Sequence, residues 1–179
     1  MPPFLSRADR TASSPDAAGR TVEALRVQYA ARSRAWRLVQ CIRVLPRGLW
    51  TATRVRRFIG RTGADTDALP AFLDRLAQRT QPGTLHPCAC STVAHRLMVR
   101  GRVHRCLPRA LVLYGLLHHT ALTNIRFCLG VDPAGVASRT VFAHAWVDVD
   151  GTPFGEGTDP RRTHRVLFRY PSAPSPATP

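Results

Sequence analysis

The segment VFAHAWVDVDG, residues 141–151, decides the fold class of this chain. Small apolar residues alternate in it with His144, Trp146 and Asp148. Because successive side chains of a strand point to opposite faces, this alternation predicts a β-strand over residues 141–149. One face of that strand is apolar, and the other carries a histidine in its middle.

Further strands are predicted on both sides of this segment. Asp150-Gly151 is a strong hairpin dipeptide, so residues 152–155 are expected to return as the next strand. Residues 125–131 precede it as a strand, and residues 165–170 are a candidate fourth. The second half of the chain therefore predicts a small antiparallel sheet.

The first half has helical periodicity instead. Apolar residues recur at spacings of three and four from about residue 21, and Pro46 with Gly48 is expected to end this helix. Residues 49–59 predict a second helix, and a third begins near Asp67. These helices are expected to bury one apolar face each.

Two more helices are predicted between these halves, at residues 87–99 and 107–117. Cys106 stands directly before the second of them. Pro108 lies in its first turn, where the missing amide proton does no harm. Helices that lead into an antiparallel sheet predict an α+β fold.

The composition is strongly basic. The formal net charge is +15, and all 26 basic residues are arginine. Such a surface attracts acidic peptides, nucleic acid or anionic membranes at long range. Because the charge is spread along the whole chain, we interpret it as general steering and expect no nucleic-acid partner. A basic binding module without catalysis, with residues 22–44 as an amphipathic helix at a membrane surface, is the alternative.

The five cysteines bear on compartment and cofactors. The N-terminus lacks the apolar stretch of a secretory signal, and the longest apolar run, residues 111–117, is too short to span a bilayer. We therefore expect a cytoplasmic protein with free thiols and no membrane span.

Histidines and cysteines gather between His86 and Cys106, but Cys88-Ala89-Cys90 is too tight for a common zinc knuckle. We expect no metal and no other cofactor.

Cys106 is the candidate nucleophile. Cysteine attacks only as the thiolate, and a helix N-terminus or a nearby cation lowers its pKa. Cys106 heads a predicted helix, and Arg105 and Arg109 flank it. A cysteine at a helix start is usually inert, however, so the prediction needs a histidine that the fold brings close.

His144 is the candidate base. Its second ring nitrogen needs an orienting group, and Glu156 lies across the predicted hairpin, roughly level with it. Asp148 shares the strand and the face of His144 but lies about 13 Å along the strand. We therefore prefer Glu156 as the third member and keep Asp148 as the alternative.

Two motifs carry a family resemblance. Residues 106–111, CLPRAL, and residues 143–151, AHAWVDVDG, resemble the transglutaminase-like cysteine peptidases that mature lasso peptides. Pro153 and Glu156 occupy the places of the proline and acidic residue that follow in that family. The resemblance covers about residues 88–170. Its specificity comes from both motifs together, because His-Ala-Trp-Val occurs across the wider superfamily.

The resemblance implies a papain-like α+β fold and removal of the leader from a ribosomally made precursor peptide. Cys106 would attack the leader–core junction, His144 would carry the proton, and Glu156 would hold the imidazole. A separate ATP-dependent cyclase would then use the freed core. Transfer of the acyl group to an amine remains an open alternative to hydrolysis.

The resemblance also implies a domain organisation. Residues 1–85 predict helices without the strands of a winged-helix module, which implies the split type that needs a separate leader-recognition protein. The basic helical part is a candidate docking surface for that protein and for the leader. The predicted regions are a disordered start (1–20), a helical N-terminal region (21–85), the catalytic core (86–170) and a disordered tail (171–179).

Overall fold

The structure is a computed structural model that describes residues 15–62, 67–78, 83–98, 106–134 and 142–172. Within these ranges helices come first and an antiparallel sheet follows, so the predicted α+β fold is confirmed. The elements are α1 (Pro15–Ala31), α2 (Arg34–Thr62), α3 (Leu69–Ala77), α4 (Pro87–Met98), α5 (Cys106–Leu117), β1 (Ile125–Val131), β2 (Ala143–Val149), β3 (Thr152–Phe154), the 3-10 helix η1 (Pro160–Arg162) and β4 (Arg165–Tyr170).

The sheet has the strand order β3-β2-β1-β4, and all neighbours are antiparallel. The hairpin predicted between β2 and β3 is confirmed, because Val149 pairs with Thr152 across two residues. Asp150 and Gly151 both have positive φ, at 51° and 82°, as this tight turn requires. β2 begins at Ala143, two residues later than predicted, and residue 141 lies outside the described ranges.

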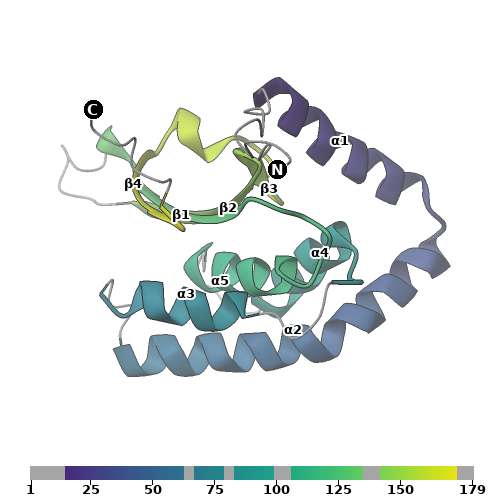
Figure 1. The fold of residues 1–179 in the computed structure, drawn as a ribbon, viewed down its shortest axis with the longest axis horizontal. Coiled ribbons are helices and arrows are strands. Elements are labelled where there is room, and N and C mark those ends of the chain that lie inside the picture. Colours follow the sequence, from purple (N-terminus) through teal and green to yellow (C-terminus); the bar gives the residue numbers. More distant parts are fainter. Residues whose placement is uncertain (1–14, 63–66, 79–82, 99–105, 135–141, 173–179) are drawn as a thin grey trace, which may run out of the picture.

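Helix α5 forms the centre of the molecule. It lies between the sheet on one side and α2 and α3 on the other (Figure 1). All residues from 110 to 117 are buried, which explains the apolar run there. Burial of residues 110–117 fixes the position of the helix, and its half-buried first turn carries Cys106. No helix in the described ranges is long and apolar enough to cross a membrane.

The prediction that Pro46 and Gly48 end a helix is wrong. The break comes earlier, where the Ser33 hydroxyl accepts a hydrogen bond from the Trp36 amide (3.2 Å) at the start of α2. α2 then continues through Pro46, and Figure 1 shows it bent, as an internal proline makes a helix. Val39 is 46% exposed, so the apolar periodicity that begins near residue 21 does not continue across this break as one buried face.

Gly48 serves packing and does not terminate the helix. A Cβ atom at this position would lie 2.7 Å from Val93 Cγ1 and 3.1 Å from Leu97 Cδ1 of α4. The absence of a side chain therefore lets α2 and α4 approach closely. Such a contact between distant segments cannot be deduced from a local glycine signal.

Two glycines of α2 give a matched test of this packing. We expect Gly48→Ala to destabilise the fold by about 1–2 kcal/mol, because the new methyl group displaces Val93. Gly60→Ala should instead stabilise by about 0.5–1 kcal/mol, since no atom lies within 4 Å of its Cβ and alanine favours the helix. Urea unfolding measures both free energies. Equal stabilisation by the two changes would show that α2 and α4 separate readily.

Candidate active site

The structure brings the three predicted site residues together. Cys106 is the first residue of α5, His144 is the second of β2, and Glu156 follows β3 by two residues. The Nε2 atom of His144 lies 3.4 Å from Glu156 Oε2. The sulfur of Cys106 is hydrogen-bonded to the His144 ring and lies 3.6 Å from the Ala143 carbonyl oxygen.

The surroundings of Cys106 favour the thiolate. Burial opposes ionisation of the thiol, but hydrogen bonds from His144 and from the backbone of Ala145 and Leu107 outweigh burial. The pKa of Cys106 is therefore lowered from its ordinary value of 9.0. Its place at a helix N-terminus acts in the same direction.

The other buried cysteines have the opposite character. Burial raises the pKa of Cys88 and Cys90, and it raises that of Cys128 to about 12. The Cys88 and Cys90 thiols donate to backbone carbonyls of different elements, those of Leu25 and Leu116. Within the described ranges, no group of three or more possible ligands could hold a metal ion, and His104 lies outside those ranges.

His144 has the electrostatics of a proton carrier. Its hydrogen bond to Cys106, followed by that to Glu156, raises its pKa to about 9 although burial opposes the charge. The lowered pKa of the thiol and the raised pKa of the imidazole both favour the form of the pair in which the sulfur is a thiolate and the ring an imidazolium. Because Nε2 faces Glu156, Nδ1 is the nitrogen left to exchange a proton with the sulfur.

Glu156 is held ionised by two partners. Burial alone would raise the pKa of this carboxyl group, but hydrogen bonds with His144 and Arg109 lower it. Arg109 donates to Oε1. Arg109 lies three residues after Cys106, on the same side of α5. We expected Arg109 to act on the sulfur, whereas the structure pairs it with the acid; Arg105 lies outside the described residues.

The backbone at Glu156 is also fixed. Gly155 has φ of 78°, a conformation that other residues adopt rarely, and a Cβ there would lie 2.6 Å from Ser91 Oγ. Arg26 of α1 donates to the Glu156 carbonyl oxygen (3.2 Å). Since α1 and α4 are far from Glu156 in sequence, these supports could not be predicted from spacing.

Asp148, the alternative third member, has other partners. Its Oδ1 accepts a hydrogen bond from Trp146 Nε1 (2.9 Å), and its Oδ2 lies 3.5 Å from the Cys128 sulfur. Trp146 in turn stacks beside His144, with ring centroids 6.0 Å apart and planes 18° apart. Asp148 thus supports the tryptophan next to His144, and the geometry favours Glu156 as the group on the imidazole.

Sequence reasoning missed a second histidine near the site. The ring of His164 lies 5.4 Å from that of His144, between centroids, at an interplanar angle of 44°. Thr163 Oγ1 lies 2.9 Å from His164 Nδ1. No motif marks this residue, because only the path of the chain between η1 and β4 brings it to β2.

Comparison with known proteins places the chain in a family. The family model described as Transglutaminase-like superfamily matches residues 50–169, which are 120 of the 179 residues. The chain belongs to the transglutaminase-like superfamily. In this transglutaminase-like protein, the residues that match the family model begin within α2, whereas the resemblance of the motifs covered the chain only from about residue 88. The matched residues include the whole candidate site. Searches of curated proteins and of solved structures give no match.

Membership in the superfamily points to two classes of reaction. The transglutaminase-like superfamily generally contains cysteine peptidases and acyl transferases. Both activities need a thiolate that forms a thioester and a histidine that moves protons. The arrangement of Cys106, His144 and Glu156 offers these two groups and an acid to orient the second.

Proposed function

We propose that this transglutaminase-like protein is a cysteine peptidase that removes the leader from a lasso-peptide precursor. The observation that carries the proposal is the hydrogen-bonded arrangement of Cys106, His144 and Glu156 at the start of α5. The motifs of residues 106–111 and 143–151 support the choice of substrate, because together they resemble the leader peptidases of this superfamily.

In the proposed reaction, the Cys106 thiolate attacks the carbonyl carbon at the leader–core junction. His144 protonates the departing nitrogen, the C–N bond breaks, and the leader remains as a thioester on Cys106. His144 then takes a proton from water, whose oxygen attacks the thioester. The C–S bond breaks, and the leader leaves as a carboxylic acid. Glu156 keeps the imidazole oriented through both steps, and Arg109 holds Glu156 in place.

The proposal extends to partners and place. We propose that a separate leader-recognition protein delivers the precursor and that an ATP-dependent cyclase uses the amine freed on the core. In support of a separate recognition protein, the described residues before position 79 are helical and contain no strand. The reaction needs a reduced thiol, and all five cysteines are free, which suits the cytoplasm.

Cleavage in water labelled with oxygen-18 tests this function. The protein, a precursor peptide and the leader-recognition protein are incubated, and the products are identified by intact mass. We expect a free core and a leader acid that carries one labelled oxygen. A second reaction contains a small primary amine in excess. If the leader appears mainly as its amide with that amine, the protein is an acyl transferase and the peptidase proposal is wrong.

Glu156→Gln should lower kcat by about two to four orders of magnitude with little change in KM. The amide keeps the shape of the side chain but removes the charge that stabilises the imidazolium. Because Glu156 raises the pKa of His144, its loss should also move the alkaline limb of the pH–rate profile below the wild-type position near pH 9. Initial rates across pH measure both effects.

Asp74→Asn is the matched control, since that carboxylate is exposed on α3 and accepts its hydrogen bond from Tyr170 of β4, away from Cys106, His144 and Glu156. We expect its rate and pH profile to match those of the wild type. A Glu156→Gln enzyme with an unchanged pH profile would exclude Glu156 as the group that orients His144.

A further inference from the structure

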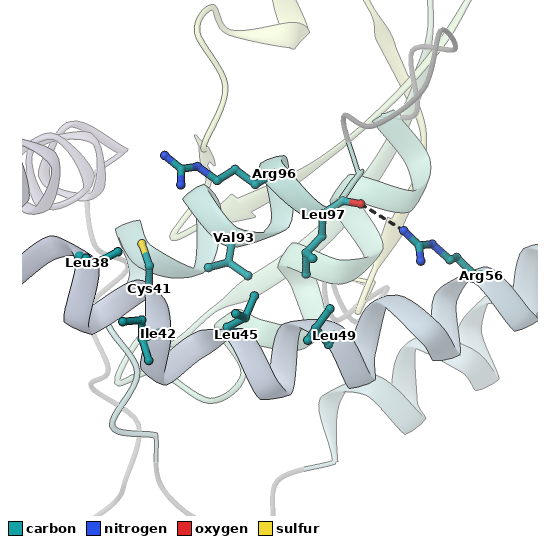
Figure 2. A pocket seen from close by; sticks show the side chains of 9 residues that line it. All are labelled: Leu38, Cys41, Ile42, Leu45, Leu49, Arg56, Val93, Arg96 and Leu97. Atoms are coloured by element: carbon teal, nitrogen blue, oxygen red, sulfur yellow. Dashed lines mark hydrogen bonds between the residues drawn. The ribbon is translucent and has the colours of Figure 1, made fainter.

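A groove of about 540 Å³ lies between α2 and α4, and no residue of the candidate active site lines it. Figure 2 shows apolar side chains of both helices pointing into it, with two arginines at its edge. The apolar lining includes Leu38, Ile42, Leu45 and Leu49 of α2 and Val93 and Leu97 of α4.

The α2 side of the groove is an exposed apolar stripe. Four large side chains follow one another at spacings of four, three and four residues, so they share one face of the helix. Their exposed fractions are 59% for Leu38, 57% for Ile42, 42% for Leu45 and 50% for Leu49. A continuous exposed stripe of this kind marks an interaction surface, whereas scattered single residues do not.

The groove has a positive border. α2 contains eight arginines and no acidic residue, and Arg96 of α4 lines the groove from the other side. Arg56 donates to the Leu97 carbonyl oxygen (3.3 Å), a partner without net charge. Among the residues that the structure describes, none of the arginines of α2 forms an ion pair. The border therefore complements negative charge.

We propose that this groove binds an acidic amphipathic helix of a separate protein. Leucine or isoleucine side chains on one face of that helix would enter the groove, and its flanking Asp or Glu residues would pair with Arg56 and Arg96. The identity of the partner rests on the proposed function: the leader-recognition protein is the partner expected to present this helix. The surface itself is independent of catalysis.

The charges disfavour the other occupants. A second copy of this chain would bring two arginine-rich faces together. The chain's own segments outside the described ranges contain two acidic residues, Asp9 and Asp65, against seven arginines. An anionic membrane has the right charge, but a flat surface does not fill a groove between two helices. A helix matches both the shape and the charge.

Fluorescence anisotropy with a synthetic peptide tests the proposal. The probe is a labelled four-turn helix with leucines on one face and glutamates on the others, and the control peptide has the same composition with the leucines distributed around the helix. We expect saturable binding of the probe that weakens with salt, and weak binding of the control. Ile42→Glu should lower the affinity at least about tenfold.

Leu167→Glu is the matched control variant, because Leu167 is 63% exposed on β4, outside the groove. It should bind as the wild type does. A double variant, Arg56→Glu with Arg96→Glu, tests the charges at the groove. It should lose more affinity for the probe than the control double variant, Arg162→Glu with Arg165→Glu. Alkylation of Cys106, measured on every variant, reports whether the active site is intact, so a failure of the groove and a failure of the proposed peptidase are distinguishable.

Several outcomes would overturn the proposal. The proposal is wrong if the probe does not bind or if both peptides bind equally. It is also wrong if Ile42→Glu and Leu167→Glu have the same affinity for the probe. Dimers in sedimentation that Ile42→Glu disrupts would assign the groove to a second copy. Binding to phosphatidylserine vesicles that the same change abolishes, without peptide binding, would assign it to a membrane.

Discussion

Replacement of Cys106 by alanine is expected to lower kcat for precursor cleavage by about five to six orders of magnitude, which leaves only background hydrolysis. No other group in the site can form the thioester, and the remaining residues act only on a nucleophile that is present. The rate is measured by intact mass with the precursor in excess. KM should change little, because the substitution is small and the contacts that bind the peptide remain.

Cys88→Ala provides the control for this change. Burial raises the pKa of the Cys88 thiol, and its sulfur donates to a backbone carbonyl in the core. We expect Cys88→Ala to retain most of the activity with a small loss of stability. Comparable losses in both variants, with both proteins folded, would mean that the reaction does not depend on Cys106 as a nucleophile.

His144→Ala is expected to have nearly the same effect, a loss of about four to six orders of magnitude in kcat, because nucleophile and base act as a unit. Without the imidazole, the thiol loses the hydrogen bond that lowers its pKa most, and the departing amine loses its proton donor. The double variant with Cys106→Ala should be no slower than either single variant. This non-additivity separates a catalytic pair from two independent structural defects.

His95→Ala is the control for the histidine, because His95 is exposed on α4 and belongs to no described contact with the site. Its activity should equal that of the wild type. If His144→Ala kept more than about a tenth of the wild-type rate, another group would have to carry the proton, and His164 would be the first candidate.

Local patterns predicted most of the fold. The alternation in β2 and the Asp150-Gly151 turn are set by neighbouring residues, so both were found from sequence. The bounds of the long helix α2 were not predicted, because Gly48 is required by its close contact with Val93 of α4 and not by its neighbours in sequence. In the sequence alone, a proline and a glycine two residues apart predict the end of a helix, because the contact between α2 and α4 cannot be seen there.

The candidate site also has contacts that local sequence predicted and contacts that it did not. Cys106 at a helix start and Glu156 across the hairpin from His144 followed from short-range geometry, and the structure places the three together. The contacts of Arg26 and His164 did not follow, since they depend on how distant segments fold over the site. Arg109 was noticed as a neighbour of Cys106, but its acidic partner emerges only from the folded chain.

The central claim, that Cys106 and His144 form a thiolate–imidazolium pair, is tested most directly by the pH dependence of alkylation. Wild type and His144→Ala react with limiting iodoacetamide, and intact mass with peptide mapping gives the rate at Cys106. The claim predicts one label, on Cys106, with a half-maximal rate below pH 9.0 in the wild type and at clearly higher pH without His144. Labels spread over several cysteines, or a wild-type midpoint at or above pH 9.0 that does not move in the variant, would contradict it.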